Sequence, residues 1–235
     1  MPNFQYTPPI TATFPTVIGG VFIGSVKNAP SSDLLLKIYQ HEQQEIKQAI
    51  GDTPLSDLPS LNAWRSAFRA FNVDPTKYRS ASEALLRRLT KKGDIPSVNT
   101  LVDIGNLVSI RYGLPVAIFD VGTLVGDTLS VQFASGEEEF WPLGVDEYEH
   151  PAPGEVIFAD AARNVYARRW CWRQSRDSAA HAETTQVIVT VEAHHTDALK
   201  TIESAVKDLE QFLREHAAFR GKAGVISAEQ PIFSA

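Results

Sequence analysis

The fold is predicted most clearly by residues 96–120, which read Pro-Ser-Val-Asn-Thr-Leu-Val-Asp-Ile-Gly-Asn-Leu-Val-Ser-Ile-Arg-Tyr-Gly-Leu-Pro-Val-Ala-Ile-Phe-Asp. Apolar residues recur at helical spacing between residues 99 and 112, and Gly113 followed by Pro115 supplies a stop signal. The short apolar run 116–119 is typical of a buried strand. This stretch therefore predicts a helix that leads directly into a strand.

The predicted helix also carries a polar stripe. Asn99, Asp103 and Asn106 are spaced so that their side chains share one face. Buried polar groups need hydrogen-bond partners, because an unpaired one costs roughly 1–3 kcal/mol. Two interpretations stay open: the stripe ties the helix to neighbouring loops, or part of it faces a ligand pocket.

The rest of the chain predicts one mixed domain. Helices are predicted through most of residues 31–112, and a final helix over 197–218 carries a continuous apolar stripe. Strands are predicted at 17–24, 128–134, 155–160, 165–174 and 186–193, with a weaker one at 139–142, and the tail 221–235 has little pattern. We therefore expect a single α/β (mixed α+β) domain over residues 1–235, with a layered central β-sheet flanked by helices.

Composition narrows the functional classes. The chain has 235 residues and a formal net charge of −6, which argues against a general nucleic-acid binder. Positive charge is nevertheless concentrated, with eight basic against two acidic residues in 60–92 and five against two in 155–176. Such asymmetry permits local contact with a polyanion, although solvated helix faces would explain the first cluster equally well. No apolar run could cross a membrane and no secretory signal is visible, so we expect a cytoplasmic protein.

The second informative stretch is residues 168–174, Arg-Arg-Trp-Cys-Trp-Arg-Gln. As a strand it would place Arg169, Cys171 and Arg173 on one face, with Trp170 and Trp172 on the other. Arginine suits phosphate or carboxylate recognition and tryptophan offers a flat surface, so one face could line a cavity. Core packing and ion pairing explain the same residues equally well.

Other chemistry finds little support in the sequence. The single cysteine is more typical of a small buried hydrophobic residue than of a nucleophile. The six histidines show no metal-ligand spacing, and there is no phosphate loop, dinucleotide fingerprint or serine-hydrolase elbow. We expect neither a metal nor a cofactor.

Two motifs resemble a known family. Val-Asn-Thr-Leu-Val-Asp-Ile-Gly-Asn-Leu-Val at 98–108, followed by Gly-Leu-Pro-Val-Ala-Ile-Phe-Asp at 113–120, resembles the B3/B4 domain of the phenylalanyl-tRNA synthetase β subunit. That family reads Val-Asn-Asn-Val-Val-Asp-Ile-Thr-Asn-Tyr-Val and then Gly-Gln-Pro-Leu-His-Ala-Phe-Asp. The likeness is strongest over residues 96–193. It implies an α/β unit that, in the synthetase, hydrolyses tyrosine wrongly attached to the phenylalanine tRNA, present here as a free-standing protein.

The resemblance also implies site residues. Asn106 matches the family's pocket asparagine, and Glu192 matches the glutamate that recognises the tyrosine hydroxyl. Gly105 stands where the family has threonine, Ala117 where it has histidine, and residues 168–173 where it has a glycine-rich strand. Because of these departures, the resemblance does not carry tyrosine specificity over to this chain.

Three functions follow as hypotheses. The first is a trans-editing hydrolase that removes a wrong amino acid from the 3′ aminoacyl end of a tRNA. In it Asn106 orients the ester or water, Glu192 binds the amino acid, and the remaining lining comes from Gly105, Ala117, Arg169, Trp170, Cys171, Trp172 and Arg173. The second is a non-catalytic module that binds a tRNA end or a free amino acid. The third is a purely structural domain, which predicts that side chains fill the cavity.

Overall fold

The computed structural model describes residues 2–235. Its helices are α1 (Pro8–Thr13), α2 (Asp33–Ile50), α3 (Pro59–Ala70), α4 (Ala81–Lys92), α5 (Thr100–Tyr112) and α6 (Ala198–Ala217), with one 3-10 turn at Leu55–Asp57. Its strands are β1 (Asn3–Tyr6), β2 (Ile18–Ser25), β3 (Val116–Asp120), β4 (Thr128–Phe133), β5 (Val156–Ala159), β6 (Val165–Arg168), β7 (Arg173–Gln174), β8 (Gln186–Ala193), β9 (Arg220–Ser227) and β10 (Ile232–Ser234). The predicted mixed α/β class is confirmed.

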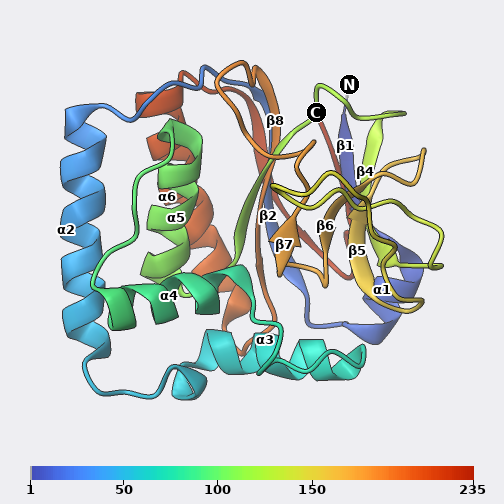
Figure 1. Ribbon diagram of the computed structural model, residues 1–235, viewed down its shortest axis with the longest axis horizontal. Coiled ribbons are helices and arrows are strands. Elements are labelled where there is room, and N and C mark those ends of the chain that lie inside the picture. The colour runs from blue at the N-terminus through green and yellow to red at the C-terminus, as the bar shows by residue number, and fades with distance from the viewer. Residues whose placement is uncertain (1) are drawn as a thin grey trace.

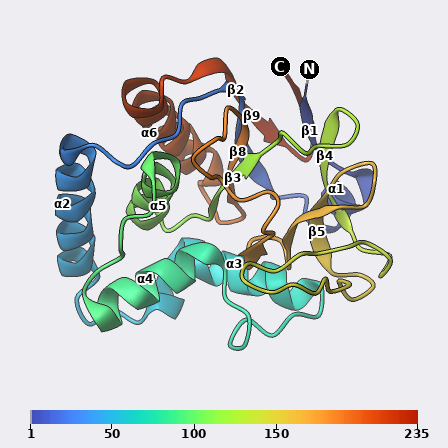
Figure 2. The ribbon, with the colours of Figure 1, turned by 45° about the horizontal axis from the view of Figure 1, so that its top comes forward.

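The strands form two sheets rather than one central sheet. A four-stranded sheet has the order β3-β8-β2-β9, and a six-stranded sheet has the order β10-β1-β4-β5-β6-β7. Figure 1 shows three layers: the helices α2, α5 and α6, then the four-stranded sheet, then the six-stranded sheet. α3 lies across one end of the sheets, and α4 lies across the same end of the helical layer, against α2 and α5 (Figures 1 and 2).

Each face of the four-stranded sheet covers its own hydrophobic core. The helix-side core contains Leu101, Leu107 and Val189, and the inter-sheet core contains Trp170 and Ile188. Residues on one strand alternate between the two cores because successive side chains of a strand point to opposite faces. The four-stranded sheet is therefore the layer that both cores share.

Local signals in the sequence fix several helix ends. Asn99 accepts a hydrogen bond from the Val102 amide at 3.0 Å, and Gly113 ends α5 at φ +63°. Ser80 accepts from the Glu83 amide at 3.3 Å at the start of α4. The predicted helix and strand of residues 96–120 are confirmed by α5 and β3.

Three predictions about strands were wrong. Residues 165–174 form two strands joined by a turn, because Arg169 and Trp170 both take left-handed conformations with φ of 46° and 57°. Residues 139–142 make only isolated bridges. The tail 221–235, expected to have little pattern, contains β10 and most of β9. None of the helices in residues 2–235 has both the length and the apolar character needed to cross a membrane.

Candidate functional site

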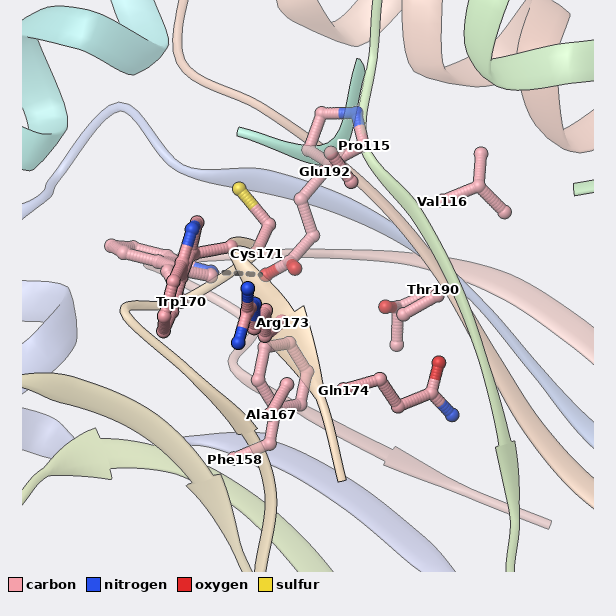
Figure 3. A pocket seen from close by; sticks show the side chains of 13 residues that line it. Pro115, Val116, Phe158, Ala167, Trp170, Cys171, Arg173, Gln174, Thr190 and Glu192 are labelled. Atoms are coloured by element: carbon pink, nitrogen blue, oxygen red, sulfur yellow. Dashed lines mark hydrogen bonds between the residues drawn. The ribbon is translucent and has the colours of Figure 1, made fainter. Parts of the chain in front are cut away.

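A small cleft, partly open to solvent, lies between the two sheets. Its lining comes from the start of α4, from β3 and the residue before it, from β5, from the face of β8 that looks toward the six-stranded sheet, and from the β6–β7 hairpin (Figure 3). The lining residues are Ala81, Pro115, Val116, Ala117, Phe158, Ala167, Trp170, Cys171, Trp172, Arg173, Gln174, Thr190 and Glu192. The Trp170 and Trp172 side chains occupy part of this region and leave only a small space, so the purely structural domain stays a hypothesis.

Glu192 is the buried acid of the cleft, with a relative exposure of 2%. Its Oε1 atom accepts hydrogen bonds from the Tyr6 hydroxyl at 2.8 Å and from the Trp170 indole at 3.0 Å. Its Oε2 atom receives no hydrogen bond from residues 2–235, and the side chain faces the cleft (Figure 3). Burial raises the pKa of Glu192 to about 7, while the two donors act in the opposite direction. The cleft therefore holds a carboxyl group with one oxygen free and a pKa near neutrality.

The Tyr6 contact depends on a close approach between strands. Tyr6 comes from β1 in the six-stranded sheet, and a Cβ atom on Gly19 of β2 would lie 2.4 Å from the Tyr6 hydroxyl. Only glycine leaves room for the phenol at this position. The N-terminal strand thus reaches the glutamate of the cleft.

The β6–β7 turn sends Trp170 into the inter-sheet core. Trp170 is fully buried and packs edge-on against Trp64, with ring centroids 5.3 Å apart. Two successive left-handed residues without glycine are strained, by roughly 1–2 kcal/mol each. Burying an indole contributes about 4–6 kcal/mol, which offsets that strain. The face alternation predicted for a continuous strand is therefore wrong here.

The arginines of the hairpin differ in their partners. Arg168 is buried and holds Glu155 through two hydrogen bonds, at 2.9 and 3.0 Å. Arg169 lies 3.8 Å from the same carboxylate but does not line the cleft. Arg173 is exposed at the mouth of the cleft and forms no ion pair within residues 2–235. Arg173 is thus the cation available to a ligand there.

Cys171 lies beside Glu192 in the cleft (Figure 3). Burial raises the pKa of its thiol well above the ordinary value, and the neighbouring Glu192 charge raises it further. A protonated thiol is a poor nucleophile. The sequence-based preference for an unreactive Cys171 agrees with this environment.

The structure brings together six of the residues predicted for the site and leaves three outside. Ala117, Trp170, Cys171, Trp172, Arg173 and Glu192 line the cleft, whereas Gly105, Asn106 and Arg169 do not. Gly105 packs toward β3, where an added Cβ would lie 3.2 Å from Ile118 Cδ1. Asn106 lies beside Tyr39 of α2. The expectation that Asn106 and Glu192 share one pocket is not met, because α5 turns its Asn106 face toward another helix.

The rest of the polar stripe on α5 is structural. Asp103 is fully buried and accepts hydrogen bonds from the hydroxyls of Ser31 and Ser97 and from the Val98 amide. Asn99 caps α5 and donates to the Ala180 carbonyl at 3.3 Å. The interpretation that the stripe ties the helix to neighbouring loops is correct for these two residues.

Sequence reasoning missed several parts of the site. Thr190 could have been found, because it lies two residues before Glu192 on β8 and so shares its face. Nothing in the sequence pattern connects Tyr6 with Glu192. Within residues 2–235 no group of three or more histidine, cysteine or acidic side chains could hold a metal ion.

The chain is similar to proteins of one family. The family model named B3/4 domain matches residues 63–226. The phenylalanine–tRNA ligase beta subunit of Solibacter usitatus is 30% identical over 133 residues, or 57% of this chain and 16% of that protein. That of Shewanella oneidensis is 31% identical over 89 residues, or 38% and 11%. An N-terminal fragment of the phenylalanyl-tRNA synthetase beta subunit from Pyrococcus horikoshii aligns over 94% of this chain and 49% of that one, with 12% identity and a TM-score of 0.45. The chain thus matches only a small part of these two ligase subunits.

Proposed function

The chain belongs to the B3/4 domain family, and from this membership and the cleft we propose that it is an aminoacyl-tRNA editing hydrolase. Its substrate is a tRNA whose 3′ adenosine carries a wrong amino acid. Water adds to the ester carbonyl, the bond to the ribose oxygen breaks, and the ribose oxygen takes up a proton. The products are a free amino acid and an uncharged tRNA.

The observation that carries this proposal is that an acidic side chain, Glu192, and a basic one, Arg173, line the same cleft. Glu192 offers its free oxygen to the ammonium group of the amino acid, and Arg173 meets the phosphate of the terminal nucleotide. Apolar groups of Ala117, Phe158 and Ala167 surround the space left for the side chain. A site of this kind accelerates hydrolysis by holding the ester and water in place.

The substrate side chain is expected to be something other than tyrosine. The Glu192 oxygen that faces the core already accepts from the Tyr6 hydroxyl, so the chain supplies its own phenol to this carboxylate. The cleft is also shaped by bulky hairpin side chains such as Trp172. We therefore expect deacylation of a tRNA that carries a small or medium amino acid.

The test is a deacylation screen across mischarged tRNAs with the wild-type protein and two variants. Glu192→Gln keeps the shape but removes the charge, and is expected to slow hydrolysis at least tenfold. Asn106→Ala tests whether the reaction takes place in the cleft or at α5. Because Asn106 lies outside the cleft, this substitution is expected to leave hydrolysis unchanged. Loss of activity only in Asn106→Ala would place the chemistry at α5 and overturn the proposed role of the cleft.

A non-catalytic binding module is the second candidate. Two observations favour it: Asn106 does not line the cleft, and Ala117 stands where the family has histidine. This candidate predicts that uncharged tRNA or a free amino acid binds, while every mischarged tRNA in the screen stays intact. Turnover of any member of the panel would exclude it.

A further inference from the structure

At the mouth of the cleft, three basic side chains stack alternately with two aromatic rings. The Arg169 guanidinium lies 3.8 Å from the centroid of the Tyr78 ring and 4.4 Å from that of Trp172. Arg173 lies 4.5 Å from Trp172, and Lys77 lies 5.1 Å from Tyr78. We call these five residues the cationic rim. Two half-buried aromatic rings thus hold three positive charges in fixed positions.

The positive charge of the rim is only weakly compensated. Lys77 and Arg173 are exposed and form no ion pair within residues 2–235, whereas Arg169 is mostly buried. The nearest carboxylate, Glu155, is 3.8 Å from Arg169 but is already held by two hydrogen bonds from Arg168. Lys77 and Arg173 are therefore the rim donors that an external anion can reach.

The rim is continuous with the cleft on one side and with α4 on the other. Trp172 and Arg173 line the cleft itself. The Ala81 amide at the start of α4 donates to the Cys171 carbonyl at 2.8 Å, which fixes the segment between α3 and α4 against the hairpin. This segment belongs to the part of the chain, residues 60–92, that has eight basic and two acidic residues. A polyanion that enters the cleft would pass over the rim.

From this arrangement we infer that the cationic rim binds the sugar–phosphate backbone of a single-stranded RNA end leading into the cleft. A guanidinium stacked on a ring keeps its in-plane N–H donors free for phosphate oxygens. Cations already lie over the faces of both rings, so the rim contacts phosphates rather than bases and reads no sequence. The inference rests on the proposed function in one respect: the 3′ end of the RNA is the end that enters the cleft. Binding of the RNA backbone to the rim does not require an aminoacyl ester.

The test measures binding of an uncharged hairpin RNA with a four-nucleotide single-stranded 3′ end by fluorescence anisotropy across a salt series. Lys77→Glu removes a rim cation, and Tyr78→Leu removes a ring while keeping an apolar side chain. Lys200→Glu is the matched control, because it makes the same charge change at an exposed position on α6. We expect Lys77→Glu to weaken binding roughly tenfold and to lower the slope of log K against log salt by about 0.7–1, with Lys200→Glu near wild type. Tyr78→Leu should weaken binding severalfold because Arg169 loses its support.

Equal affinity of Lys77→Glu and Lys200→Glu would overturn the inference, as would equal binding of a blunt-ended hairpin. If inorganic phosphate displaced the RNA at an equal total concentration of phosphate groups, the rim would be a simple anion site, and the inference would also be overturned. The deacylation screen across mischarged tRNAs separates this inference from the proposed function. If every mischarged tRNA stays intact while RNA binding still depends on Lys77, the editing proposal fails and the inference about the rim stands.

Discussion

Glu192 is a buried carboxyl group that accepts hydrogen bonds from a phenol and an indole, and no arginine or lysine of residues 2–235 forms an ion pair with it. Tyr6 and Trp170 both donate to the same oxygen, Oε1. Neutral donors stabilise the charged form less than a cation would, so burial prevails and the pKa of Glu192 rises to about 7. The Glu192 carboxyl group therefore makes the stability of the fold depend on pH. It is also the group proposed to bind the ammonium of the amino acid.

The pH dependence of stability follows from this shift. Between about pH 4.5 and 7 the folded protein keeps a proton on Glu192 that the unfolded chain releases, so the free energy of unfolding falls as pH rises through that window. The total loss is about 3 kcal/mol. Burial lowers the pKa of His194 to about 3, which acts in the opposite direction between pH 3 and 6.5. Urea unfolding at pH 5 and 8 should therefore be compared between wild type and Glu192→Gln, and the difference between them isolates Glu192. An identical pH dependence in both proteins would contradict the shift.

The hydrogen bond from the Tyr6 hydroxyl should lower the pKa of Glu192. Tyr6→Phe removes one donor to the carboxylate, so the pKa of Glu192 should rise further, and unfolding at pH 8 should become easier by about 2 kcal/mol. The pKa can be followed by ¹³C NMR of the labelled carboxyl carbon. Tyr39→Phe is the matched control, because it removes a buried phenol hydroxyl from the helix-side core, where the neighbouring polar residue is Asn106 and not Glu192. A lower Glu192 pKa in Tyr6→Phe would show that the phenol does not stabilise the charge.

At the scale of elements, α5 and the β6–β7 hairpin mark what the sequence could and could not predict. The start and end of α5 follow from Asn99 and Gly113, which are local capping signals. The hairpin could not be predicted, because Arg169 and Trp170 adopt left-handed conformations that neither side chain favours. That turn is held by the burial of the indole, a long-range contact with no signature in local sequence.

The site shows the same division. Family motifs placed Glu192 and most of the hairpin in one cleft, but they carried Asn106 there as well. A motif fixes the position of a residue along a helix, whereas its surroundings depend on how that helix packs. The donor from β1 lies 186 positions away from Glu192 in the chain, and no spacing rule reaches that far.

Asp103 and Asn106 of α5 offer a direct test of this packing. Asp103→Ala leaves two hydroxyls and one amide without their shared acceptor, so unfolding should become easier by about 3 kcal/mol. Asn106→Ala, one turn further along at a partly exposed position, should change stability by less than about 1 kcal/mol. Urea unfolding measures both. A larger loss in Asn106→Ala than in Asp103→Ala would contradict the structural role given to Asp103.

At the scale of the whole molecule, the four-stranded sheet couples two cores. β8 sends Ile188 to the inter-sheet core and Val189 to the helix-side core, and β2 sends Val21 and Phe22 to opposite sides in the same way. If the four-stranded sheet unfolds, the side chains of both cores become exposed to solvent. The single domain predicted over residues 1–235 thus has a physical test in the cooperativity of unfolding.

We predict one cooperative transition for the whole chain. Tryptophan fluorescence reports mainly on the inter-sheet core, which holds Trp64 and Trp170, and far-ultraviolet circular dichroism reports mainly on the helices packed in the other core. The two urea curves should coincide in the wild type. Ile188→Ala should lower the free energy of unfolding by about 2–5 kcal/mol and shift both curves together, and Val189→Ala, although it faces the opposite core, should also shift both. If each variant moved only the probe of its own core, the two layers would unfold separately and the sheet between them would not join them into one domain.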